Sequence, residues 1–204
     1  MMIQVEGFVL SGGASRRMGS DKAALAFGGS TLALRAFDTL KTLSQNVWLV
    51  GDERFSGVPI VPDVFKLEAP GVRASIVGLH SALCHSSTEW IAILACDMPF
   101  VDAELFRRFV NIASHSRQEL DAIIPADRYG KLQPFAALYR CEVCLPAVEA
   151  MLSKEDFRLT ELTNKLKTHI MAYPDYGDLD ADDRLFFNVN TPEDYAVALQ
   201  WLNQ

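Results

Sequence analysis

Two kinds of hydrophobic pattern alternate along the chain. Short, nearly continuous apolar runs are typical of strands buried inside a sheet, and residues 90–95 (WIAILA) are the clearest example. Other segments carry apolar residues at helical spacing, as residues 31–43 (TLALRAFDTLKTL) do. The predicted strands are 7–11, 47–50, 58–61, 90–95, 121–125 and 135–139. The predicted helices are 31–43, 74–85, 102 to about 113, 142–153, 158–166 and a last helix from residue 192.

Strands that alternate with helices predict an α/β fold, a three-layer α/β/α sandwich around a mainly parallel sheet. The sequence shows no repeat, low-complexity tract or linker, so we expect residues 1–204 to form a single domain. Residues 175–183 (DYGDLDADD) are acidic and poor in large apolar side chains, which predicts an exposed loop. The last helix has Thr191 as its predicted N-cap, Pro192 at its first position and Asp194 three residues after the cap, a variant of the capping box.

The charge of the chain limits its partners. Its 204 residues include 26 Asp and Glu against 19 Lys and Arg, a net charge of −7. Because proteins that bind nucleic acids usually have a basic surplus, we expect no nucleic-acid partner, whereas a small anion needs only a local positive cluster. No apolar run could span a bilayer and the first residues do not resemble a signal peptide, so we expect a cytoplasmic protein with no membrane partner.

Cys141 and Cys144 form a CxxC motif, which can be redox-active or bind a metal ion. The sequence has no second CxxC and no nearby pair of histidines to complete a zinc site. We therefore expect this pair of cysteines to be structural.

The segment 8–22 (FVLSGGASRRMGSDK) carries the first candidate site. It follows the end of a predicted strand, and ligands of parallel sheets bind outside the carboxyl ends of the strands. Gly12 and Gly13 allow a tight turn whose N–H groups can surround an anion. Arg16, Arg17 and Lys22 add full positive charge, so the set suits a triphosphate. The segment matches neither the P-loop nor the dinucleotide-binding pattern.

Asp97 is the candidate metal ligand, because it follows the buried strand 90–95 and would lie at the same edge of the sheet. Mg²⁺ prefers oxygen ligands and is usually held by one or two carboxylates together with phosphates and water. Asp102 is the predicted N-cap of the next helix. The structural alternative for Asp97 is a similar role in a turn or a cap.

Three further polar residues follow predicted strands. Asp63 comes after Pro62 in what could be an ordinary turn. Asn188 and Asn190 flank Val189 on a predicted strand end, where alternation would place both amides on one face. Neutral amides can donate and accept hydrogen bonds without adding negative charge, which suits an anionic acceptor substrate. The alternative is a pair of loop-forming residues before a capped helix.

The segment 10–22, LSGGASRRMGSDK, resembles the LAGGxSxRMGxDK signature of molybdenum cofactor guanylyltransferases, the MobA family. Three other segments resemble motifs of this family in the expected order. They are the Pro62 and Asp63 step, residues 95–100 (ACDMPF) and residues 187–195 (FNVNTPEDY). The resemblance implies the nucleotide-diphospho-sugar transferase fold, which is Rossmann-like. It also implies transfer of GMP from GTP to the terminal phosphate of molybdopterin, with pyrophosphate as the second product.

The resemblance also implies roles for the candidate residues. The backbone of Leu10, Ser11, Gly12 and Gly13, together with Arg17 and Lys22, would hold the GTP phosphates. Asp97 would hold Mg²⁺ and Asp63 would contact the nucleotide, while Asn188 and Asn190 would lie near molybdopterin. The attacking phosphate monoester needs no general base, since its second pKa is about 6. A transient contact with molybdoenzymes or cofactor-delivery proteins is a further expectation.

The sequence departs from the family pattern at three places. Ser11 replaces an alanine, Val50 and Gly51 stand where an asparagine is usual, and residues 74–78 (ASIVG) replace a GPLxG-type segment near the base. These departures leave open a cytidylyltransferase of the same cofactor that uses CTP, or a nucleotidyltransferase with another phosphorylated acceptor such as a sugar 1-phosphate. A non-catalytic cofactor carrier is disfavoured, because Lys22 and Asp97 are both present.

Overall fold

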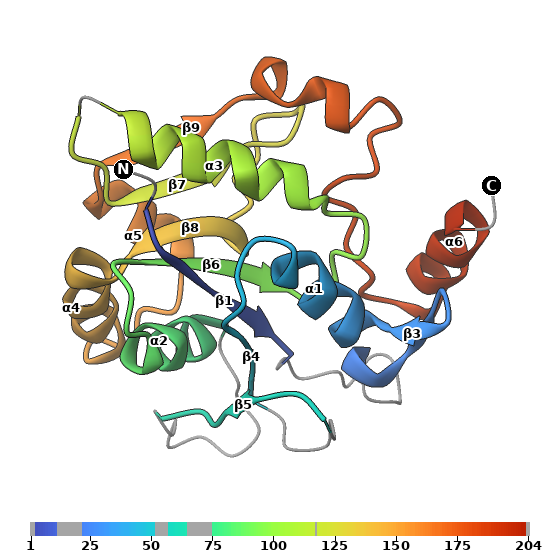
Figure 1. Ribbon diagram of the computed structural model, residues 1–204, viewed down its shortest axis with the longest axis horizontal. Coiled ribbons are helices and arrows are strands. Elements are labelled where there is room, and N and C mark those ends of the chain that lie inside the picture. The colour runs from blue at the N-terminus through green and yellow to red at the C-terminus, as the bar shows by residue number, and fades with distance from the viewer. Residues whose placement is uncertain (1–2, 12–21, 52–56, 65–74, 117, 203–204) are drawn as a thin grey trace.

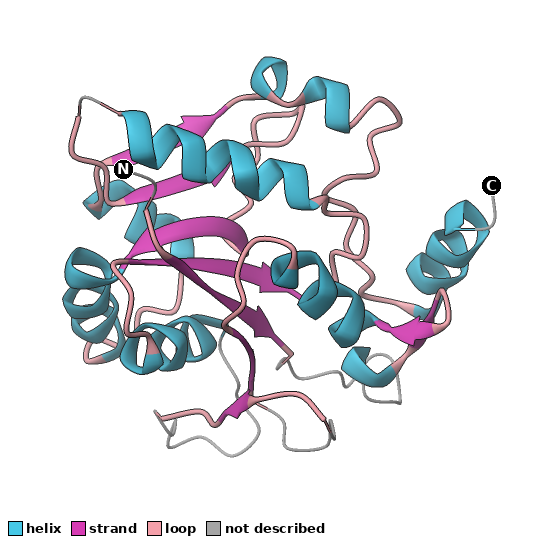
Figure 2. Ribbon diagram, viewed as in Figure 1, coloured by secondary structure: helices cyan, strands magenta, loops and turns pink. Residues whose placement is uncertain are grey.

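The computed structural model describes residues 3–11, 22–51, 57–64, 75–116 and 118–202. Within these residues the chain forms a central sheet of seven strands with helices on both faces (Figure 1 and Figure 2). The strands lie in the order β5-β4-β1-β6-β8-β7-β9. Their bounds are β1 Val5–Leu10, β4 Val47–Val50, β5 Ile60–Val61, β6 Trp90–Ala95, β7 Ala122–Pro125, β8 Ala136–Arg140 and β9 Thr168–Met171.

Strand direction confirms the expected mainly parallel sheet. Strands β5, β4, β1 and β6 run parallel to one another, and β9 runs parallel to β7. Within the seven-stranded sheet, β8 alone among the described strands runs against its neighbours, pairing antiparallel with both β6 and β7. The sheet therefore presents the carboxyl ends of β5, β4, β1 and β6 at one edge.

Helices cover the sheet as two layers, which confirms the three-layer sandwich. Helices α1 (Leu32–Lys41) and α3 (Ala103–His115) pack on one face, and α2 (Ser75–His85), α4 (Cys141–Leu152) and α5 (Leu159–Lys165) pack on the other. Alternation along β1 shows the cause: Phe8 and Leu10 join the core under α2 and α4, while Val9 joins the core under α1 and α3. Because both faces of β6 are buried, its sequence WIAILA is continuously apolar.

Three short strands of the structure have no counterpart in the sequence prediction. A hairpin of β2 (Ala26–Phe27) and β3 (Ser30–Thr31) precedes α1, and β9 adds a strand at the edge of the sheet. The predicted strand 58–61 shortens to Ile60–Val61. The other predicted strands and helices are present, with bounds that move by up to two residues.

The expectation that 175–183 is an exposed loop is wrong in part. Two single-turn helices, η2 (Tyr173–Asp175) and η3 (Gly177–Leu179), lie in this region, and Tyr176 between them is fully buried. Asp180 is also buried. Its Oδ1 accepts hydrogen bonds from the backbone N–H groups of Arg184 and Leu185 at 2.8 and 2.9 Å, which compensate the burial of the carboxylate. The acidic composition thus reflects backbone capping as well as solvent exposure.

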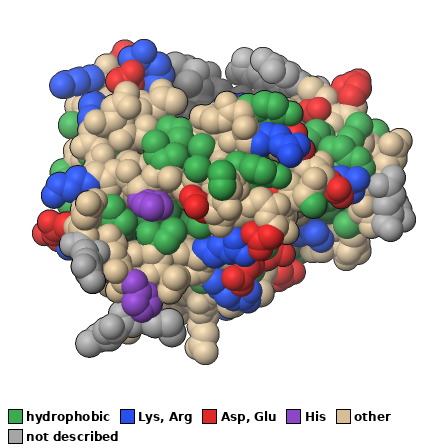
Figure 3. All heavy atoms as spheres, turned by 90° about the horizontal axis from the view of Figure 1, so that it is seen from above, with side chains coloured by type: hydrophobic (Ala, Val, Ile, Leu, Met, Phe, Trp, Pro, Cys, Tyr) green, Lys and Arg blue, Asp and Glu red, His purple; other side chains and the backbone are tan. Residues whose placement is uncertain are grey.

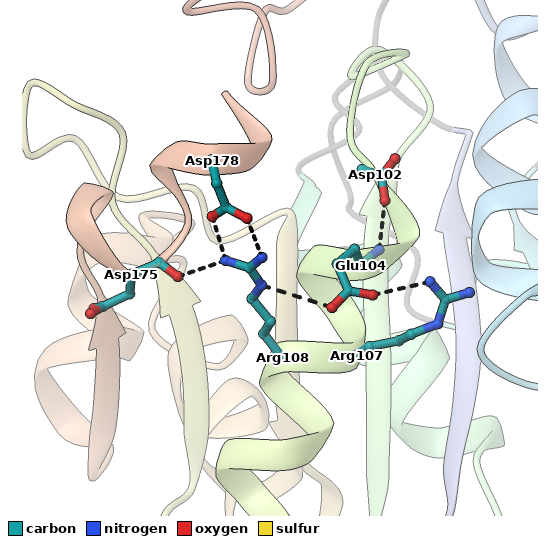
Figure 4. A network of polar contacts seen from close by, with 6 residues as sticks. All are labelled: Asp102, Glu104, Arg107, Arg108, Asp175 and Asp178. Atoms are coloured by element: carbon teal, nitrogen blue, oxygen red, sulfur yellow. Dashed lines mark hydrogen bonds and ion pairs between the residues drawn. The ribbon is translucent and has the colours of Figure 1, made fainter. Parts of the chain in front are cut away.

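An arginine on α3 holds this acidic segment against the sandwich (Figure 4). Arg108 donates to the Asp175 carbonyl oxygen at 2.9 Å and binds both carboxylate oxygens of Asp178. The hydrogen bond between Arg108 and Asp178 lowers the pKa of the Asp178 carboxyl and raises the pKa of the Arg108 guanidinium. Helix α3 itself begins at the predicted N-cap, where Asp102 accepts from the Glu104 N–H. Arg108 therefore ties residues 175–178, from which the chain runs on toward residues 188–190, to α3.

A third, smaller core joins the last helix to the β2–β3 hairpin that precedes α1. Helix α6 (Pro192–Leu202) packs on the β2–β3 hairpin, and Phe27, Leu32, Val189 and Ala198 are its buried members. The Tyr195 hydroxyl donates to the Ala26 carbonyl oxygen. The predicted capping box is confirmed: Thr191 Oγ1 accepts from the Asp194 N–H at 3.1 Å, and Asp194 Oδ2 accepts from the Thr191 N–H at 2.9 Å.

The surface carries mixed charge. On the face shown in Figure 3, Lys and Arg side chains lie beside Asp and Glu side chains rather than in a patch of one sign. Ion pairs of Arg107 and Arg108 with Glu104 are examples from α3. Among the described helices, none combines the length and the apolar character needed to cross a membrane.

One carboxylate is built into the sheet itself. Glu6 on β1 is 2 % exposed, and it accepts hydrogen bonds from the Ser86 hydroxyl (2.7 Å), the Ser87 N–H (2.9 Å) and the Ser87 hydroxyl (2.8 Å). Burial raises the pKa of Glu6, but the hydrogen bonds from Ser86 and Ser87 lower it by more, so the pKa lies below its ordinary value of 4.5. The ionised carboxylate thus fastens the turn between α2 and β6 to β1.

We expect Glu6→Gln to lower the free energy of unfolding by about 1–2 kcal/mol at pH 7, because an amide nitrogen would face hydroxyl and N–H donors. Since folding lowers the pKa of Glu6, its ionisation stabilises the fold above pH 4.5, and this contribution is lost as the pH falls through the folded pKa. In urea unfolding, the difference in free energy of unfolding between the wild type and Glu6→Gln should therefore be smaller below pH 4 than at pH 7. Glu142→Gln, at an 82 % exposed side chain, is the control and should change little. Equal effects of the two variants would contradict the assignment.

The hairpin turn offers a matched pair of glycines. Gly28 and Gly29 both have positive φ, 62° and 80°, as a two-residue turn of this kind requires. A Cβ on Gly28 would lie 3.1 Å from Leu202 of α6, whereas a Cβ on Gly29 would meet no atom within 4 Å. Each Gly→Ala change should cost about 1 kcal/mol of stability from backbone strain, and Gly28→Ala should cost more because α6 must shift. Thermal unfolding that ranks the two variants equally would show that α6 does not press on the turn.

Candidate functional site

The candidate site lies where β1, β4, β5 and β6 end. Leu10 at the end of β1 pairs with Val50 on one side and with Ala95 on the other. Val50 in turn pairs with Val61, the last residue of β5. The residues that follow these positions therefore leave the sheet at one edge. This edge brings Ser11, Asp63 and Asp97 to the same side of the molecule, as the sequence predicts.

Ser11 is already tied into the sheet. Its N–H and its hydroxyl both donate to the Val50 carbonyl oxygen, at 3.2 and 2.8 Å. The Leu10 side chain is buried, and its carbonyl oxygen accepts from the Cys96 N–H at 3.1 Å. These bonds fix the point from which the glycine-rich segment starts. Gly12, Gly13, Arg16 and Arg17 lie outside the described residues.

A lysine, a carboxylate and an amide meet at this edge, although they come from distant parts of the chain. Lys22 Nζ lies 2.7 Å from Asp97 Oδ2 and donates to Asn190 Oδ1 at 2.8 Å. Lys22 begins the single-turn helix η1 (Lys22–Ala24), Asp97 lies two residues after β6, and Asn190 precedes α6. The side chains of Lys22 and Asp97 are 15 % and 22 % exposed. The ammonium is thus held by two acceptors and is still open to an anion.

One carboxylate oxygen of Asp97 lacks a hydrogen-bond donor among the described residues. This oxygen, Oδ1, is buried. A buried carboxylate oxygen without a donor is costly unless a cation or another donor satisfies it. The residue therefore fits a divalent cation with oxygen ligands. No three His, Cys, Asp or Glu side chains converge within the described residues.

The two asparagines differ from the sequence prediction. Residues 187–190 form an irregular segment and not a strand end, because the Val189 N–H bonds to the Asp97 carbonyl oxygen at 2.8 Å instead of joining a ladder. Asn190 contacts Lys22, whereas the Asn188 amide nitrogen donates to the Phe186 carbonyl oxygen at 2.9 Å. The two amides therefore bind different partners and, against what alternation predicts, do not share one face of a strand. The contact between Asn190 and Lys22 has no signal in the local sequence beyond the capping motif that follows.

Asp63 lies at the far side of the same edge. It is half-buried, two residues after β5, just as Asp97 lies two residues after β6. Strands β4 and β1 lie between β5 and β6, so the two chain segments leave the sheet about 14 Å apart. The strands that precede Asp63 and Asp97 are therefore not neighbours in the sheet.

The CxxC pair supports the structural interpretation. Cys144 on α4 is fully buried and its thiol donates to the Asp121 carbonyl oxygen at 3.4 Å. Burial raises the pKa of Cys144 to about 12 and also raises the pKa of Cys141. A thiol that stays protonated is a poor nucleophile and a poor metal ligand.

The sequence of residues 7–169 matches the family described as the MobA-like NTP transferase domain. A curated protein of Pelotomaculum thermopropionicum, named a probable molybdenum cofactor guanylyltransferase, is 31% identical over 202 residues, which cover 97% of this chain and 93% of that protein. A protein of Geobacillus with the same name is 28% identical over 201 residues, covering 95% of this chain and 97% of the other.

Solved structures show the same fold. Molybdopterin-guanine dinucleotide biosynthesis protein A from Archaeoglobus fulgidus superposes with a TM-score of 0.79 at 23% identity, covering 97% of this chain and 98% of the other. 2-C-methyl-D-erythritol 4-phosphate cytidylyltransferase from Thermus thermophilus gives a TM-score of 0.66 at 16% identity over the full length of both chains. The expected α/β fold is confirmed, and with most of its length matched, the chain belongs to the MobA-like NTP transferase domain family.

Proposed function

We propose that this protein transfers GMP from GTP to the terminal phosphate of molybdopterin, forming the guanine dinucleotide cofactor and pyrophosphate. The observation that carries the proposal is the Lys22 ammonium, held 2.7 Å from Asp97 at the carboxyl edge of the sheet. A cation and a metal-binding carboxylate side by side are what a triphosphate needs. The names of the curated relatives support guanylyl transfer to this cofactor in particular.

The reaction joins two anions, so the barrier lies in bringing phosphates together and in stabilising the leaving pyrophosphate. An oxygen of the acceptor phosphate attacks the α-phosphorus of GTP, and the bond from that phosphorus to the pyrophosphate oxygen breaks. Lys22 would contact the triphosphate, and the backbone of Gly12 and Gly13 with the Arg17 guanidinium would complete its binding. These groups act by position and charge, because the acceptor phosphate is already ionised near neutral pH and requires no base.

Asp97 would hold Mg²⁺ through its buried Oδ1, which lacks a donor among the described residues. When bound, Mg²⁺ would neutralise phosphate charge, which Lys22 alone cannot do. The roughly 14 Å between the strand ends that precede Asp63 and Asp97 favours Asp63 on the nucleoside side and not at the metal. Asn190, next to Lys22, would lie between the nucleotide and the acceptor, with Asn188 nearby in sequence.

The substrates under this proposal are GTP and molybdopterin, and a transient contact with molybdoenzymes that receive the product is part of it. We also propose that residues 1–204 act as one nucleotidyltransferase domain. The contacts of α6 with the β2–β3 hairpin support this, since the C-terminal segment completes a site that begins at the N-terminal strand.

The nucleotide is the first point to test. With Mg²⁺ and molybdopterin, pyrophosphate release should occur with GTP and not with CTP, ATP or UTP. Lys22→Ala should lower kcat/KM by about a hundredfold or more, because a charge that stabilises the transition state is lost. Lys131→Ala, at an exposed turn residue, is the matched control and should retain activity. Release with CTP alone would move the protein to the cytidylyl branch. No release with any nucleotide would contradict the proposed reaction and direct the assay to sugar phosphates or to a carrier role.

Metal binding can be measured without turnover. Mn²⁺ binding in the presence of GTP, followed by electron paramagnetic resonance, should be strong in the wild type and weakened at least tenfold in Asp97→Asn. Asp102→Asn is the control, because asparagine caps a helix as well as aspartate does and Asp102 accepts from the Glu104 N–H instead of facing the cluster. Unchanged Mn²⁺ binding in Asp97→Asn would remove Asp97 from the metal site.

A further inference from the structure

The segment that carries Asn190 is fastened on both sides. On one side, the Val189 N–H donates to the Asp97 carbonyl oxygen at 2.8 Å, and the Val189 side chain is fully buried in the core under α6. On the other side, the Asn190 N–H donates to Asp194 Oδ2 at 2.9 Å. The backbone of Asn190 therefore has little freedom, although its side chain is exposed.

The capping box of α6 extends one residue beyond the usual pattern. The same oxygen of Asp194 that accepts from the N-cap Thr191 also accepts from Asn190. The capping box consists of the two bonds between Thr191 and Asp194, so the bond to Asn190 is additional to it. This extra bond orients the peptide from which the Asn190 side chain reaches Lys22.

The direction of the Asn190 amide is fixed by chemistry. A lysine ammonium can only donate, so the atom that contacts Lys22 Nζ at 2.8 Å must be Oδ1. The amide Nδ2 then has no hydrogen-bond partner among the described residues. Its orientation depends on the backbone that Asp194 holds.

We propose that Asp194 is a positioning residue of this site: through the backbone of Asn190 it holds the amide that holds the Lys22 ammonium beside Asp97. The proposal rests on the proposed nucleotidyl transfer and deepens it. Asp194 touches neither Lys22 nor the reacting atoms, and its effect passes through two hydrogen bonds. Without it, the Lys22 ammonium would keep Asp97 as a partner and lose its second fixed acceptor.

The same helix provides controls that separate positioning from helix stability. Glu193→Ala removes a carboxylate from the first turn of α6, and the exposed Glu193 side chain makes no hydrogen bond or ion pair to another described residue. Thr191→Ala removes the other half of the capping box and leaves the acceptor for Asn190 in place. Asp194→Asn loses the charge but keeps an oxygen that can accept both N–H bonds.

The experiment measures kcat and KM for the nucleotide that the wild type uses, the Kd of its Mg²⁺ complex by calorimetry, and Tm for each variant. We expect Asp194→Ala to lower kcat roughly ten- to a hundredfold, whereas Glu193→Ala keeps the wild-type rate. Thr191→Ala should match the loss of Tm in Asp194→Ala without matching its loss of kcat, and Asp194→Asn should recover most of kcat. In a Lys22→Met background, Asp194→Ala should weaken nucleotide binding no further.

Two results would overturn the positioning role in an active protein. One is an Asp194→Ala variant whose kcat falls no more than that of Thr191→Ala at equal Tm. The other is an equal loss of nucleotide affinity from Asp194→Ala with and without Lys22. A wild type that releases no pyrophosphate with any triphosphate defeats the proposed function instead, and the binding measurements then still decide whether Asp194 acts through Lys22.

Discussion

A positive charge that is mostly shielded from water needs acceptors, and at this site they come from two remote segments. Lys22 is 15 % exposed, and its ammonium is satisfied by a carboxylate after β6 and an amide before α6. An unpaired ammonium at this depth would be destabilised, because desolvation of a charge is costly without compensation. The rest of the architecture can be understood as the means of bringing these three groups together.

Each part of the scaffold fixes one of the three partners. The parallel strands place Asp97 at the sheet edge, and the buried faces of β6 leave that strand no freedom to slide. The hairpin and α6 form a small core of their own that sets the path from Lys22 into α1. The contact of Arg108 with Asp178 and the hydrogen bonds to the buried Asp180 hold the segment that leads from β9 to residue 190. The triphosphate would then meet a charge cluster that is already assembled, which reduces the cost of ordering it on binding.

The sequence predicts what depends on short-range patterns and misses what depends on distant partners. Strand 90–95 is recognisable because a strand buried on both faces must be apolar throughout. Strand β9 (THIM) is short, half-exposed and without alternation, so its pairing with β7 leaves no periodic trace. The acidic composition around Asp180 predicts an exposed side chain. The carboxylate is buried instead, where it accepts from the N–H groups of the residues four and five positions later. Asn190 is separated from Lys22 by 168 residues, and no local pattern encodes that contact.

That separation has a consequence for the newly made chain. As the protein leaves the ribosome, β1, β4, β6, β7 and β8 can begin to pair and the helices between them can begin to pack. All of these elements precede residue 141 and follow one another closely. The lysine acquires its amide partner only after Asn190 and helix α6, whose Asp194 accepts from the Asn190 N–H, have emerged. Contacts between residues far apart in sequence also form late, since the entropy of closing the loop must be overcome first. A nascent chain therefore has its sheet before it has a complete charge cluster, and the cluster that we propose binds a triphosphate is complete only after α6 has emerged.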